Sequence, residues 1–88
     1  MTTRRYLDQK LSFRQLRAMD AIASHLTLLK AASALNVSQP ALSKTLQELE
    51  ETLQLKVFDR HSRGMRLTAE GAIVLRTGRR VLAELRRL

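Results

Sequence analysis

The stretch NVSQPALSKTLQELEETL, residues 36–53, contains the only proline of the chain. Proline is well tolerated in the first turn of a helix, because the N–H groups there have no intrahelical acceptor. Pro40 therefore predicts the start of a helix with Ser38 as its N-terminal cap. The residue before a proline is biased away from helical geometry, so Gln39 is an alternative capping residue. Four leucines at helical spacing form the predicted buried face: Leu42, Leu46, Leu49 and Leu53.

Charged and polar residues are ordered unusually along this helix. Gln39, Ser43 and Lys44 lie in its first turns, and three glutamates follow between residues 48 and 51. An isolated helix favours the opposite order, with carboxylates near its N-terminus and cations near its C-terminus. The observed order suits a helix whose N-terminal end faces phosphate groups.

Two further helices are predicted before residue 36. Ser12 and Gln15 form a capping box, which predicts a helix from Phe13. Thr27 caps a second, short helix, and Asn36 is suited to the left-handed conformation of a tight turn after it. The predicted buried residues of the first helix are Phe13, Leu16, Met19, Ile22, Ala23 and Leu26, and those of the second are Leu28, Ala31, Ala32 and Leu35.

A β-hairpin is predicted after this group of helices. Two short apolar stretches, LKVFD and MRL, are separated by residues 60–64. Gly64 supplies a positive φ for the turn. The predicted tip is basic, because it carries Arg60 and Arg63 and is flanked by Lys56 and Arg66.

A long last helix is predicted from Thr68, which is its cap. Apolar or small residues alternate at spacings of four and three, as in the seam of a coiled coil. This seam predicts a homodimer through the last helix. Its members are Val74, Gly78, Val81, Leu85 and Leu88.

Composition limits the remaining possibilities. The 88 residues carry a formal net charge of +8, which indicates one small domain with an anionic partner. The chain has no cysteine and two histidines, so neither a disulfide nor a metal site is predicted. No catalytic motif occurs. We expect a cytoplasmic, non-enzymatic domain that needs no cofactor and does not associate with membranes.

The predicted fold is mainly α. It is a winged helix-turn-helix of three helices plus a two-stranded β wing, followed by a long dimerisation or linker helix. The predicted boundaries are a basic extension at 1–11, the winged helix-turn-helix at 12–67 and the last helix at 68–88. Gln and Ser side chains read base edges, and Lys and Arg bind phosphate or guanine, so the pattern favours binding to DNA. Two alternatives are a winged-helix module that binds another protein, and a basic helix at 69–88 that lies on a membrane surface.

The sequence also resembles the N-terminal DNA-binding domain of LysR-type transcriptional regulators. The resemblance covers residues 13–88 and is carried by FRQLRAMDAIA, AASALNVSQPALSKTLQELEETL and LKVFDRHSRGMRLTAEG. It implies a bacterial regulator that binds an interrupted inverted repeat in double-stranded DNA as a dimer, with a tetramer in the full-length protein. It also implies a C-terminal effector-binding domain, absent from this chain, for a small-molecule effector. The segment SKTLQELE is most similar to the corresponding segment in regulators of aromatic-acid or sugar catabolism.

The resemblance also assigns residues to DNA. The helix from Pro40 is expected in the major groove, and Arg63 of the wing in the minor groove. Gln54 departs from the family, which usually has glycine there, and Lys44 stands where arginine is frequent. The expected DNA-binding residues are Ser38, Gln39, Pro40, Ser43, Lys44, Gln47 and Arg63, and the candidate contacts to the DNA backbone are Thr27, Arg60 and Arg66.

Overall fold

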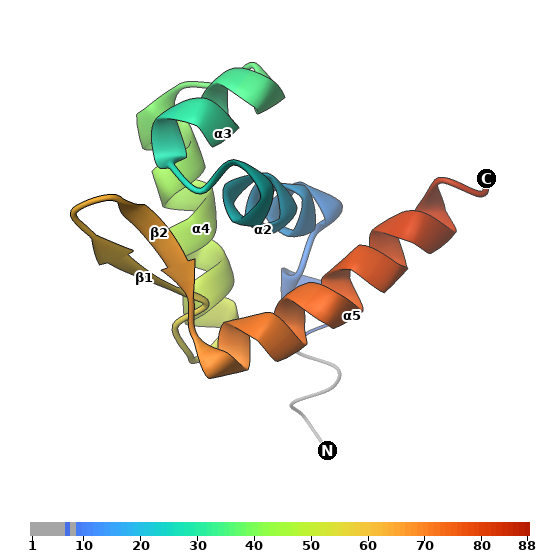
Figure 1. Ribbon diagram of the computed structural model, residues 1–88. Helices are drawn as coiled ribbons and strands as arrows, with labels where there is room; N and C mark the ends of the chain where they lie inside the picture. The colour runs from blue at the N-terminus through green and yellow to red at the C-terminus, as the bar shows by residue number, and fades with distance from the viewer. Residues whose placement is uncertain (1–6, 8) are drawn as a thin grey trace.

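The computed structural model describes residue 7 and residues 9–88 of the chain. The predicted basic extension therefore lies largely outside the described residues. The fold is a winged helix-turn-helix followed by a long helix, as predicted (Figure 1). Its elements are α2 (Phe13–His25), α3 (Leu28–Leu35), α4 (Gln39–Leu53), β1 (Phe58–His61), β2 (Gly64–Leu67) and α5 (Ala69–Leu85).

The four main helices begin at hydroxyl caps. The Ser12 hydroxyl accepts from the Gln15 N–H at 3.2 Å, and the Gln15 side chain accepts from the Ser12 N–H at 3.1 Å, which completes the predicted capping box. Thr27 caps α3 at 3.1 Å. Ser38 caps α4 through the Ala41 N–H at 3.1 Å, so the alternative with Gln39 as the cap is wrong.

The first three of these helices end in left-handed residues that are not glycine. Asn36 has φ 58°, as its residue type predicted. Gln54 adopts φ 58° without the usual glycine, and its side-chain amide donates to the Glu51 carbonyl at 2.7 Å. Leu26 has φ 69° and ends α2. Three residues of different types thus take the left-handed position that glycine usually occupies at a helix end.

The core lies where α2 meets α3, α4 and α5. Met19, Ile22 and Leu49 are fully buried there. The predicted burial of Phe13 and Leu26 is wrong, because they are 49% and 59% exposed at the two ends of α2, beyond the helices that cover its middle. The buried hydrophobic residues are Leu16, Ala18, Met19, Ile22, Ala31, Ala32, Leu42, Leu46, Leu49, Val57, Phe58, Met65, Leu75 and Leu82.

The wing is an antiparallel hairpin in which Phe58 pairs with Leu67 and His61 with Gly64. Its tip is therefore only Ser62 and Arg63. The prediction that Arg60 lies in the tip is wrong, because Arg60 extends β1 opposite Met65. The hairpin projects from the body on the side opposite the C-terminal end of α5 (Figure 1).

One edge of the wing is joined to the end of α2. The Met65 N–H donates to the Leu26 carbonyl at 2.8 Å. Gly64, with φ 135°, lies so close to the same carbonyl that a Cβ atom there would collide with it. The position therefore requires glycine both for its backbone conformation and for this contact.

The last helix packs on α2, where Gly78 faces Met19 and Leu16. Its other buried residues are Gly71, Leu75 and Leu82. The Arg79 Nε lies 2.7 Å from Asp20 Oδ1 and ties the two helices together at their surface. None of the helices in the described part of the chain is both long enough and apolar enough to span a membrane.

One member of the predicted dimer seam faces the inside of the chain. A Cβ atom at Gly78 would lie 2.6 Å from the Met19 Cε, so this glycine serves the packing of α5 on α2 within the chain. Leu88 lies beyond the end of α5 and is fully exposed. Val74 and Leu85 are half-buried, and Val81 is 39% exposed.

Candidate nucleic-acid interface

The exposed N-terminal part of α4 carries most of the predicted DNA-binding residues. Ser38, as the cap, directs its hydroxyl to the helix, and Pro40 occupies the first turn. Gln39, Lys44 and Gln47 are exposed, whereas Ser43 is half-buried. The structure therefore leaves three long polar side chains free to meet a ligand at this end of the helix.

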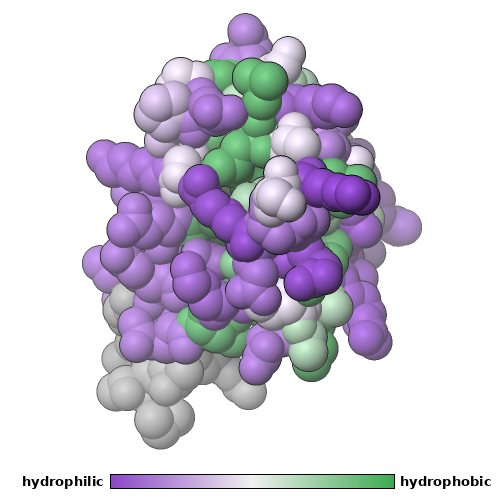
Figure 2. Space-filling view, turned by 60° about the vertical axis from the view of Figure 1, so that its left-hand side comes forward, coloured by the Kyte–Doolittle hydropathy of each residue, from purple (hydrophilic) through white to green (hydrophobic). Residues whose placement is uncertain are grey.

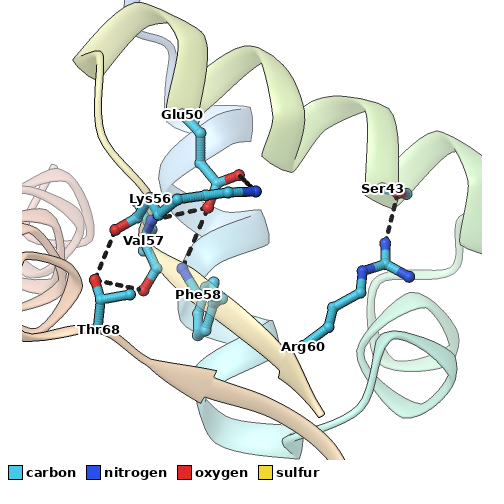
Figure 3. Close-up of polar contacts among 7 residues, drawn as sticks. All are labelled: Ser43, Glu50, Lys56, Val57, Phe58, Arg60 and Thr68. Carbon is cyan, nitrogen blue, oxygen red and sulfur yellow. Dashed lines mark hydrogen bonds and ion pairs between the residues drawn. The ribbon is translucent and has the colours of Figure 1, made fainter.

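Ser43 is half-buried because the wing reaches it. The Arg60 Nη2 donates to the Ser43 hydroxyl oxygen at 3.2 Å (Figure 3). Arg60, predicted as a contact to the DNA backbone, thus connects β1 to the second turn of α4. The contact joins residues far apart in the sequence, so the local patterns gave no sign of it.

A groove brings the wing tip next to the starts of α3 and α4. It is bordered by Thr27 and Gln39 on the helices and by Arg63 on the wing. Leu28, Leu29 and residues 60–62, 64 and 65 complete its lining. The structure thereby brings together predicted residues from three separate segments of the sequence. The Thr27 hydroxyl already accepts from the Lys30 N–H as the cap of α3.

Two arginines of the wing, Arg63 and Arg66, are exposed. Arg63 is exposed at the tip, and its backbone N–H donates to the His61 Nδ1 at 3.3 Å. Arg66 is exposed on β2. Figure 2, with the wing side turned forward, shows mainly hydrophilic side chains around a narrow hydrophobic strip. This face has the polar and basic character that a polyanion requires.

A half-buried carboxylate fixes the wing against α4, and no pattern in the sequence predicts this contact. Glu50 Oε2 accepts from the Val57 N–H at 2.8 Å and the Phe58 N–H at 3.2 Å (Figure 3). Its other oxygen lies 3.8 Å from the Lys56 Nζ. In the sequence Glu50 is one of three glutamates between residues 48 and 51. The two backbone bonds show that it also holds the start of β1.

Thr68, which follows β2, fixes the segment that leads into β1. Its hydroxyl donates to the Lys56 carbonyl at 2.6 Å (Figure 3). The same hydroxyl accepts from the Gly71 N–H at 2.8 Å. Its own N–H donates to the Val57 carbonyl at 3.0 Å. One residue thus caps α5 and fixes the chain that enters β1, which orients the wing relative to the last helix.

The helices α3 and α4 with their tight turn, braced by α2 and followed by a hairpin, define a winged helix-turn-helix domain. The model of the bacterial regulatory helix-turn-helix proteins of the lysR family matches residues 13–72. The chain belongs to this family.

Known proteins of similar sequence are transcriptional regulators. The regulator PcaQ of Agrobacterium fabrum is 36% identical over 80 residues, which are 91% of this chain and 26% of PcaQ. The SDS degradation transcriptional activation protein of a Pseudomonas species is 48% identical over 69 residues, which are 78% of this chain and 22% of that protein. The chain therefore spans about a quarter of the length of these relatives.

Solved structures agree with this assignment. The DNA-binding domain of CbnR, in a crystal structure with DNA, matches with a TM-score of 0.84 and 38% identity over 88% of each chain. The DNA-binding domain of BenM, in complex with benA site 1 DNA, matches with a TM-score of 0.84 and 31% identity, covering 88% of this chain and 86% of that one.

Proposed function

We propose that this chain is the sequence-specific, double-stranded DNA-binding domain of a bacterial transcription regulator. The observation that carries the proposal is the groove in which Gln39 of α4 and Arg63 of the wing tip, distant in sequence, border the same space. The DNA complexes of the similar CbnR and BenM domains support it. A formal charge of +8 supplies the attraction to phosphate that all such domains use.

In the proposed complex the N-terminal end of α4 enters the major groove. Gln39 has the amide that pairs with the N6 and N7 edge of adenine, and Lys44 is a point charge for phosphate. The ring of Pro40 offers an apolar surface to a thymine methyl group. Arg63 at the wing tip enters the minor groove, where its charge is most strongly attracted to narrow A·T-rich tracts.

We further propose that the regulator acts as a dimer on an interrupted inverted repeat, with a tetramer as its larger assembly. Val81 and Ile73 of α5 are 39% and 63% exposed, and Val74 and Leu85 are half-buried, so α5 has apolar surface left to bury. The whole protein would work in the cytoplasm without enzymatic activity of its own. A small-molecule effector would bind to a further C-terminal domain.

Selection from a random duplex pool tests the main proposal. The chain should enrich one half-site motif, and its affinity for the selected duplex should fall steeply as salt rises, because phosphate contacts release counterions. The alternative function, a module that binds another protein, predicts no enrichment of any duplex. That result would overturn the proposal.

Substitutions in α4 should separate base contacts from phosphate contacts. Gln39→Ala should lower the preference at one or two adjacent base pairs by about fivefold or more and keep the salt dependence. Lys44→Ala should lower the affinity for all duplexes by the same factor. It should also reduce the slope of log affinity against log salt concentration by about 1. The measurement is a titration of each variant against single base-pair variants at several salt concentrations. If Gln39→Ala keeps every preference, α4 is not the reading helix.

The dimer is tested on α5. Val81→Asp should abolish concentration-dependent self-association in sedimentation, because it places a charge in the apolar seam. Ala83→Asp is the matched control, since Ala83 is exposed on another side of the same helix. A wild-type chain that stays monomeric at high micromolar concentration would contradict the proposed dimer.

A further inference from the structure

The contact between the wing and α4 suggests a role for Arg60 beyond binding phosphate. The Arg60 guanidinium meets the Ser43 hydroxyl oxygen at 3.2 Å and is exposed, and the serine is half-buried (Figure 3). Both residues border the groove between α4 and β1. The bond therefore lies at the surface that the proposed function turns toward DNA.

No carboxylate neutralises Arg60 in the part of the chain that the structure describes. The three ion pairs there use Glu50, Asp20 and Glu84. Asp59, its neighbour in β1, is not among them. The guanidinium thus keeps its full charge next to Ser43, and the hydrogen bond to the serine is not a by-product of a salt bridge.

The direction of this hydrogen bond limits what Ser43 offers to a ligand, because Arg60 takes one of the two lone pairs of the serine oxygen. A guanidinium has only donors, so the serine oxygen must accept. Thr45, two residues further along α4, shows the usual alternative, because its hydroxyl donates to the Ala41 carbonyl at 3.0 Å. Among the described residues, no acceptor takes the Ser43 proton in the same way. Ser43 therefore retains its O–H as a donor, and the adjacent cation polarises it.

We propose that Arg60 is a positioning residue that sets the base preference of Ser43 by taking one of the two lone pairs of the serine oxygen, so that the serine presents its O–H to the base. This inference rests on the proposed DNA binding. In the major groove a donor selects the O6 and N7 acceptors of guanine or the O4 acceptor of thymine, and it disfavours the amino group of cytosine. The unpaired charge of Arg60 strengthens the same preference.

The consequence is that the wing takes part in major-groove reading without entering the major groove. Arg60 belongs to β1, whose start is fixed by Glu50 through the Val57 and Phe58 N–H groups. The carboxylate and the guanidinium thus set the distance between wing and helix at two points. The wing thereby orients a side chain of the helix that reads the bases.

The test uses the duplex that the wild-type chain selects, together with its single base-pair variants. Ser43→Ala identifies the base pair that Ser43 reads, where preference for guanine or thymine over cytosine should fall about fivefold. Arg60→Ala should reduce the preference at that same base pair by a similar factor. The double variant should reduce it no further, because both changes remove one interaction.

Arg66→Ala is the matched control. Arg66 is exposed on the paired strand β2, so this variant removes the same charge from the wing without touching Ser43. Arg66→Ala should lower the affinity for all duplexes by the same factor. It should leave the preference unchanged at the base pair that Ser43 reads. Thermal unfolding of the variants should match that of the wild type, because the replaced arginines are exposed.

Three outcomes would overturn the inference. One is an Arg60→Ala variant that behaves like Arg66→Ala, since Arg60 would then be a phosphate contact only. Another is additive loss of preference in the double variant. The third is a Ser43→Ala variant with every preference intact. If the wild-type chain selects no duplex at all, the proposed function fails first and the inference with it.

Discussion

Replacing Glu50 with alanine should lower the free energy of unfolding by about 3 kcal/mol. The change removes the shared acceptor of the Val57 and Phe58 N–H groups, and both residues are buried. A buried N–H group without a partner costs about 1–3 kcal/mol. For a domain of this size the midpoint of thermal unfolding should fall by at least about 12 °C, as circular dichroism would measure.

Two controls separate this effect from a general loss of charge. Glu51→Ala removes an exposed carboxylate next to Glu50 and should change the free energy of unfolding by less than about 0.5 kcal/mol. Glu50→Gln keeps one acceptor oxygen and should cost less than Glu50→Ala. A Glu50→Ala variant as stable as Glu51→Ala would show that the carboxylate does not hold the wing.

Replacing Gly71 with alanine should cost about 2–3 kcal/mol, although alanine is the better helix former. A Cβ atom at this position would collide with the Val57 carbonyl, and it would lie 3.0 Å from the Thr68 hydroxyl. Backbone cannot move aside as a flexible side chain does, so α5 must shift from the base of the wing. Overpacking of this kind costs about 1–3 kcal/mol.

Gly78→Ala is the matched control for this prediction. It makes the same substitution in the same helix, but its nearest obstacle is the Met19 Cε, the end of a flexible side chain. The gain in helix propensity, about 1 kcal/mol, should offset much of the displacement. Equal losses for the two variants in urea unfolding would contradict the account given for Gly71.

The helices and their caps could be predicted because their causes are local. Each helix begins at a serine or threonine whose hydroxyl accepts from the N–H three residues later, as at Ser12, Ser38 and Thr68. Asn36 similarly predicted a left-handed helix end. The spacing of apolar residues predicted most of the core correctly, but not Phe13 and Leu26. Helical periodicity identifies which face of a helix is apolar. It does not show how much of the length of that face a neighbouring helix covers.

The contacts that hold the wing could not be predicted, since they join distant segments. Nothing near Glu50 in the sequence distinguishes it from Glu48 or Glu51, yet only its side chain turns toward β1 among the contacts of the described residues. The sequence assigns Gly78 to the predicted dimer seam for a related reason. Its spacing fits the seam of a dimer, and only the position of Met19 shows that the glycine faces inward.

The bond from the Met65 N–H to the Leu26 carbonyl occupies part of the outer edge of the wing. A two-stranded sheet has two open edges, and each is a template for pairing with a strand of another molecule. The end of α2 occupies part of the β2 edge with its own carbonyl, so a foreign strand would have to displace this bond. We therefore expect the left-handed turn at Leu26, which places this carbonyl, to disfavour edge-to-edge pairing of the wing with other chains.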